Sequence, residues 1–113
     1  MEFEEFKNYK RIEDERYPNI ALFELETGER FFIEPNFYTQ LRYAKDHFMK
    51  QYDSIIETMI NIVKRNKRII FTADYEMPVV YDDSYYYREL EDVLGEIGLS
   101  FDNKSNPHSD WKD

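Results

Sequence analysis

The chain has 113 residues, which is enough for one domain with its own hydrophobic core. It has no cysteine, so disulfides and thiolate metal ligands are excluded. With 24 acidic and 15 basic residues its net charge is −9, which argues against direct binding to a nucleic-acid backbone. Aromatic residues make up 18% of the chain, too many for a disordered acidic segment. No apolar run is long enough to cross a membrane and no secretory signal is visible, so we expect a cytoplasmic protein in a reducing compartment.

The first predicted elements are an N-terminal lead-in and a hairpin. Residues 2–16 carry apolar side chains at a spacing of three, which indicates either a short amphipathic helix or an irregular segment. Proline 18 favours a break, because the residue before a proline avoids helical geometry. Over residues 20–33, two runs rich in aromatic and branched residues flank a four-residue connection that contains Gly28. This pattern predicts a β-hairpin.

The longest predicted element is a helix over residues 37–65, with Asn36 as its N-cap. Its apolar positions follow one another at steps of three and four residues, and neither Gly nor Pro interrupts them. A second apolar row widens the buried face in the later half and consists of Met49, Ile56, Ile60 and Val63. A strand is expected directly afterwards, over residues 67–73, where Ile69, Ile70 and Phe71 form a compact apolar run.

A second, shorter helix is predicted over residues 84–97, with Tyr86 and Leu90 on its apolar face. Gly98 stands where a helix-ending glycine belongs, and Leu99 is the expected hydrophobic contact beyond it. The order of elements predicts an α+β fold in which a small, mostly antiparallel sheet packs against the long helix. We expect one domain over residues 1–101 and a polar, flexible tail over 102–113.

The distribution of charge is uneven, and residues 69–98 hold eight acids against one base, Arg88. In a helix over 84–97, the positions 85, 89, 92 and 96 would lie in one row, with neighbouring side chains about 5–6 Å apart. Such a row of carboxylates with tyrosine nearby would match the basic groove of a nucleic-acid-handling enzyme. The competing interpretation is a solvated face of an acidic protein.

Three consecutive tyrosines, Tyr85 to Tyr87, cannot all face the core of a helix, so at least one of those flanking Tyr86 should be exposed. Tyrosine is common in interface cores. The residues predicted to bind a partner are Asp82, Asp83, Tyr85, Tyr87, Glu89, Asp92 and Glu96. In composition alone, and without any shared motif, the chain resembles the small acidic inhibitors that viruses and mobile elements encode. It is therefore predicted to be a non-enzymatic inhibitor or regulator that occupies such a groove.

Two alternatives stay open. One is a subunit or homodimer that assembles through the predicted helix 37–65, since its wide apolar face exceeds what one sheet covers. The other is a metal-dependent hydrolase that uses acid pairs such as Glu24 with Glu26 or Asp82 with Asp83. No cofactor, metal site or catalytic group is predicted, because no nucleophile, base and orienting group occur together. The basic cluster over residues 64–68 is interpreted as complementing a helix C-terminus, with pairing to the acidic block as a further option.

Overall fold

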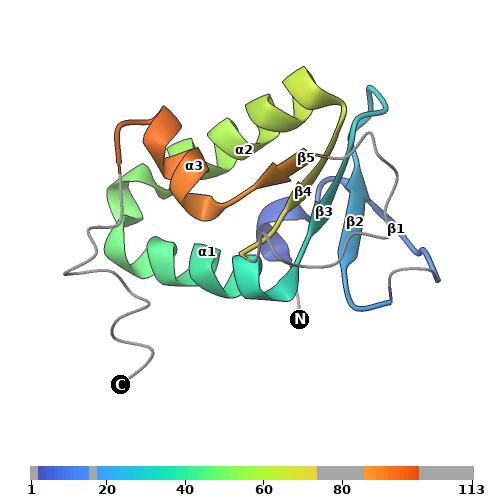
Figure 1. Ribbon diagram of the computed structural model, residues 1–113, viewed down its shortest axis with the longest axis horizontal. Coiled ribbons are helices and arrows are strands. Elements are labelled where there is room, and N and C mark those ends of the chain that lie inside the picture. Colours follow the sequence, from blue (N-terminus) through green and yellow to red (C-terminus); the bar gives the residue numbers. More distant parts are fainter. Residues whose placement is uncertain (1–2, 16–17, 74–85, 100–113) are drawn as a thin grey trace.

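The computed structural model describes residues 3–15, 18–73 and 86–99 (Figure 1). They form two layers, a five-stranded sheet and three α-helices that lie on one face of it. The α+β class predicted from the sequence is confirmed. The remaining residues, among them the predicted tail 102–113 and the candidate residues Asp82, Asp83 and Tyr85, lie outside the described part of the chain.

The sheet is mixed and its spatial order is the same as the order in sequence, β1 to β5. Strands β1 (Lys10–Ile12), β2 (Ala21–Glu24) and β3 (Arg30–Ile33) pair antiparallel, so the predicted hairpin is confirmed. Strands β4 (Arg68–Phe71) and β5 (Tyr86–Arg88) continue the sheet beyond β3 in parallel. The predicted strand over 67–73 is thus also confirmed.

The main core lies between the helices and one face of the sheet, and aromatic rings fill its centre. Phe31 stacks on Phe23 with ring centroids 5.3 Å apart and contacts Phe71 edge-on at 6.1 Å. The opposite face also carries buried apolar side chains, those of Leu22 and Phe32 among them. Because both faces are buried, the central strands read as continuous apolar runs rather than as alternating ones.

The predicted uninterrupted helix over 37–65 is wrong. The chain forms α1 (Pro35–His47), a single 3₁₀ turn η2 (Met49–Gln51) and α2 (Tyr52–Asn66), and it leaves helical geometry at Phe48, whose φ is −126° and ψ 43°. An unbroken helix over this range would be about 44 Å long, whereas the greatest extent of the molecule is 37 Å.

Parallel pairing of β3 with β4 explains the break. Arg30 and Arg68 are register partners, so the chain must leave the end of β3 and return to the level at which β3 began. Helix α1 leads away from the sheet and α2 leads back, and the two open as a V from the η2 turn (Figure 1).

The start of α1 also differs from the prediction, because Glu34 rather than Asn36 is the N-cap. The buried Glu34 carboxylate accepts hydrogen bonds from the backbone N–H groups of Asn36, at 2.9 Å, and Phe37, at 3.2 Å. Pro35 occupies the first turn, where its missing N–H costs nothing. The acid and the proline together replace the expected asparagine cap.

The second predicted helix begins later than expected. Helix α3 covers only Leu90–Glu96, and Tyr86 to Arg88 form strand β5 instead, with Tyr86 paired to Ile69. The end of the helix is as predicted: Gly98 has a φ of +78°, and the N–H of Leu99 donates to the carbonyl oxygen of Leu94 at 2.8 Å. This is a Schellman motif, in which glycine is the favoured residue.

The N-terminal segment forms the 3₁₀ turn η1 (Glu4–Phe6) followed by β1, so the amphipathic-helix reading holds for one turn only. Phe6 is fully buried against the helical face of the sheet, and Phe3 and Tyr9 pack at the edge of the same core. The apolar residues spaced three apart in this segment are therefore packed against the core, although the segment does not form a regular helix.

Candidate binding surfaces

The tyrosines near β5 are arranged by strand geometry, in which consecutive side chains point to opposite faces of the sheet. Tyr86, expected to be buried, is 56% exposed. Tyr87 is half-buried beside Ile70 on the sheet face opposite the helices. Its hydroxyl oxygen is buried and has no hydrogen-bond partner among the described residues, and burial raises its pKa. The exposed tyrosine in the described part is therefore Tyr86.

The predicted acidic row is only partly formed, because β5 replaces the first turns of the expected helix. Glu89 is the half-buried N-cap residue of α3, and Asp92 is exposed in its first turn together with Glu91. We call Tyr86, Glu89, Glu91 and Asp92 the β5–α3 patch. It keeps an exposed ring and several carboxylates close together in the chain.

Glu96, one of the residues predicted to bind a partner, pairs with basic residues of its own chain. Its carboxylate accepts a hydrogen bond from the Arg65 guanidinium at 2.6 Å and lies 4.0 Å from that of Arg88. Arg65 belongs to the basic cluster at the end of α2, so this acid ties α3 to α2 and to β5. The basic cluster over residues 64–68 therefore pairs with the acid-rich stretch 69–98 at this residue, as one of the two interpretations of the cluster predicts.

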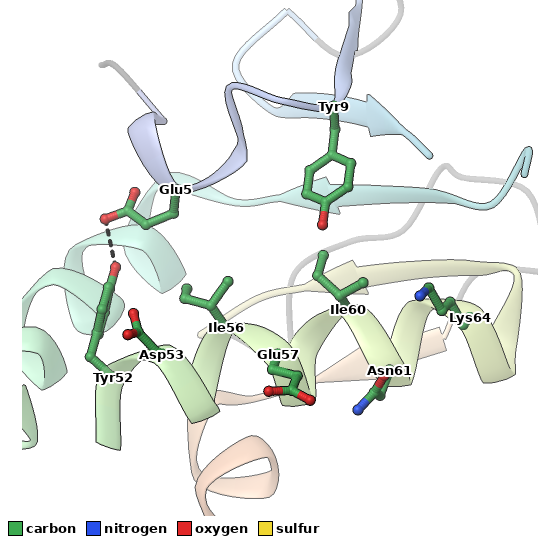
Figure 2. A pocket seen from close by; sticks show the side chains of 9 residues that line it. All are labelled: Glu5, Tyr9, Tyr52, Asp53, Ile56, Glu57, Ile60, Asn61 and Lys64. Atoms are coloured by element: carbon green, nitrogen blue, oxygen red, sulfur yellow. Dashed lines mark hydrogen bonds between the residues drawn. The ribbon is translucent and has the colours of Figure 1, made fainter. Parts of the chain in front are cut away.

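A groove runs along α2 and was not predicted (Figure 2). It has a volume of about 460 Å³ and lies between α2 and the segment that joins η1 to β1. Ile56 and Ile60 point from α2 toward Tyr9, while Glu5 and Tyr52 lie at one end. A second hollow of about 340 Å³ shares Tyr9 and Ile60 and extends to the β2–β3 turn. We call the larger one the α2 groove.

Polar residues of α2 complete the wall of this groove. Asp53 and Glu57 are exposed acids four residues apart, and Lys64 lies at the opposite end. None of these three side chains forms an ion pair with another described residue. Their charges are therefore available to something that enters the groove.

The end of the α2 groove is fixed by a buried carboxylate, that of Glu5, whose side chain is only 7% exposed. Its oxygens accept hydrogen bonds from the hydroxyls of Tyr38, at 2.7 Å, and Tyr52, at 2.5 Å. The guanidinium of Arg42 donates a third bond at 3.1 Å. One acid of η1 thus holds together residues of α1 and α2.

These contacts shift the pKa values of all three acidic groups. Burial favours the neutral form of Glu5, but the hydrogen bonds from Tyr52 and Tyr38 outweigh it, and the pKa of Glu5 lies below its usual value. Burial and the bond to Glu5 raise the pKa of Tyr38 to about 12 and also raise that of Tyr52. At neutral pH the cluster therefore consists of an ionised acid and two protonated donors.

The second apolar row, on which assembly through the helices would depend, is mostly covered within the domain. In the second apolar row, Ile60 and Val63 are buried in the protein's own core and Ile56 is half-buried, whereas Met49 is 76% exposed. Glu24, one member of a predicted acid pair, accepts a 2.8 Å hydrogen bond from Arg30. In the part of the chain that the structure describes, no three potential ligands lie close enough to hold a metal ion.

None of the helices within residues 3–15, 18–73 and 86–99 combines the length and apolar character needed to cross a bilayer. No protein-family model, curated protein or solved structure matches the chain.

Proposed function

We propose that this chain is a small, acidic, non-enzymatic protein-binding module that inhibits or regulates a partner by covering a basic surface. The observation that carries the proposal is the β5–α3 patch, where Tyr86 is 56% exposed just ahead of an acidic helix. An exposed tyrosine supplies rigid contact area at low entropic cost, and the carboxylates that follow it in the chain favour a basic partner and speed its approach.

The favoured partner is a nucleic-acid-handling enzyme, because its groove offers the opposite charge to a chain of net charge −9. The proposed contact residues are Glu89 and Asp92, which the sequence also predicts, together with Tyr86 and Glu91. The proposal leaves out Glu96, whose carboxylate is hydrogen-bonded to Arg65 and lies 4.0 Å from the guanidinium of Arg88 in the same chain. The absence of cysteine is compatible with action in the cytoplasm.

The test is affinity capture from a bacterial lysate with quantitative mass spectrometry, in the presence and absence of heparin as a competing polyanion. The test variant is Glu91→Gln/Asp92→Asn, which removes two charges from the patch. The matched control is Glu13→Gln/Glu15→Gln, which removes the same charge from two exposed residues just after β1. We expect wild type and control to retain a nucleic-acid-handling enzyme that heparin displaces, and the patch variant to retain less of it.

The kinetics give a second readout once a partner has been captured. Charge removal at the rim of an interface acts mainly on the association rate, and the effect weakens as salt rises. Retention that neither heparin nor the patch variant reduces would refute the proposal. Retention of the chain's own copies alone would instead support assembly through the helices.

A further inference from the structure

The α2 groove combines an apolar floor with an acidic rim. Ile56 and Ile60 lie one helical turn apart and face Tyr9 across the groove (Figure 2). Ile56 stays half-buried in the domain alone, so part of its surface is open to solvent. Apolar surface held open between two elements gains stability when a further apolar side chain covers it.

The charged residues at the rim of the groove indicate which charge a bound segment should carry. Asp53 and Glu57 are exposed on successive turns of α2, about 6 Å apart along the helix axis. Glu26, at the β2–β3 turn, adds a third carboxylate where the neighbouring hollow extends the groove. Lys64 is the one base that lines either hollow, so the rim is acidic on balance.

Glu5 fixes the geometry of the groove and adds little to its charge. Both of its oxygens are already hydrogen-bonded to Tyr38 and Tyr52, and Arg42 neutralises its charge. Because these bonds tie η1 to both helices, the separation of the two groove walls is set before any partner arrives. A preformed groove loses less conformational entropy on binding than one that must close.

We propose that the α2 groove binds a short, basic, amphipathic segment of a partner protein. Apolar side chains of the segment rest mainly on the half-buried Ile56 and Tyr9, and its Lys or Arg side chains pair with Asp53 and Glu57. From Tyr52 to Lys64 the groove follows about 18 Å of helix, the length of five or six extended residues. This surface is separate from the β5–α3 patch, so the proposal stands or falls independently of the function proposed above.

The probe is a phage-displayed library of random twelve-residue peptides, selected on the wild-type protein. Enriched sequences are synthesised with a fluorescein label, and their dissociation constants are measured by fluorescence anisotropy. We expect enriched peptides to carry at least two Lys or Arg residues with apolar residues between them. Enrichment of acidic or uncharged peptides would overturn the proposal that the groove binds a basic segment.

Two charge-matched variants locate the site. Asp53→Asn/Glu57→Gln should weaken the selected peptides about fivefold or more, as expected for the loss of two exposed ion pairs. Glu91→Gln/Asp92→Asn removes the same charge from the β5–α3 patch and should leave the affinity within about twofold, since neither residue lines the two hollows and exposed charges outside a site are screened by salt. Equal weakening by both variants would show non-specific attraction and overturn the proposal.

A second variant tests the apolar floor. Ile56→Ala shortens a half-buried side chain and should weaken the peptide while the urea midpoint shows that the domain stays folded. If no peptide is enriched, or if Ile56→Ala has no effect on affinity, the groove does not bind such a segment. Concentration-dependent dimerisation that Ile56→Ala abolishes would assign the groove to a second copy of the chain and would likewise overturn the proposal.

Discussion

The substitution Glu5→Gln tests whether the buried carboxylate holds the N-terminal segment in place. Wild-type Glu5 accepts two tyrosine hydroxyls and an arginine N–H, and its side chain is only 7% exposed. Glutamine has nearly the same shape but carries no charge. The substitution therefore removes the charge and leaves one acceptor oxygen in place of two, so one tyrosine hydroxyl must instead accept from the amide NH2, while the packing stays almost unchanged.

The expected loss follows from the hydrogen bonds. A bond to a charged group contributes about 1.5–3 kcal/mol and a neutral one about 1 kcal/mol, so each tyrosine bond loses about 1 kcal/mol. The exposed half of the pair, Arg42, adds little because water screens it. We expect Glu5→Gln to lower the free energy of unfolding by about 2 kcal/mol near pH 7.

The stability difference between wild type and Glu5→Gln should also depend on pH, in a direction that the pKa of Glu5 determines. The pKa of Glu5 is lowered in the folded state, so its contribution is complete above the pKa of the unfolded chain. That contribution is lost as the pH falls through the folded-state pKa. The difference between wild type and Glu5→Gln should therefore be largest near neutral pH and shrink progressively below about pH 4.

Urea denaturation followed by circular dichroism at several pH values measures this difference. The control is Glu4→Gln, which removes the same charge from the exposed neighbouring residue and should change stability by less than about 0.5 kcal/mol. If Glu5→Gln and Glu4→Gln have equal, pH-independent effects, the cluster does not stabilise the fold as argued.

Two further substitutions test single features of the fold by the same urea assay. Tyr87→Phe removes a buried hydroxyl that lacks a partner among the described residues, so it should leave stability unchanged or raise it by about 1 kcal/mol; a loss above that would show that the hydroxyl is bonded. Lys67→Gly should stabilise by about 0.5–1 kcal/mol because Lys67 has a φ of +65°, which glycine adopts without strain. Lys67→Ala is its control and should bring no such gain, since alanine is as strained there as lysine.

The strands and helices were predictable where a single periodicity ran for many residues. The step of three and four over 37–65 located both α1 and α2, but it could not reveal the break at Phe48. Apolar residues face the same core on both sides of the η2 turn, so the pattern continues across it. The break is imposed by the pairing of β3 with β4, which is a long-range constraint.

The site was less predictable than the fold. A stretch of three residues is too short for the spacing of its apolar side chains to distinguish a strand from a helical turn. Tyr86 lies in β5 because it pairs with Ile69 of β4, a contact that the local sequence does not reveal. Nothing local separates Glu5 from Glu4, since both are acids in an acid-rich segment. The hydrogen-bond partners of Glu5, Tyr38 and Tyr52, lie 33 and 47 residues further along the chain.

That separation has a consequence for how the molecule is made. Tyr52 follows Glu5 by 47 residues, so at about 5–20 residues per second the ribosome needs about 2–10 s to deliver it. During this interval Phe3 and Phe6 lack the helices and much of the sheet on which they pack. Folding of the N-terminal segment must therefore wait for α2, and until then its aromatic side chains stay exposed to chaperones that bind such residues.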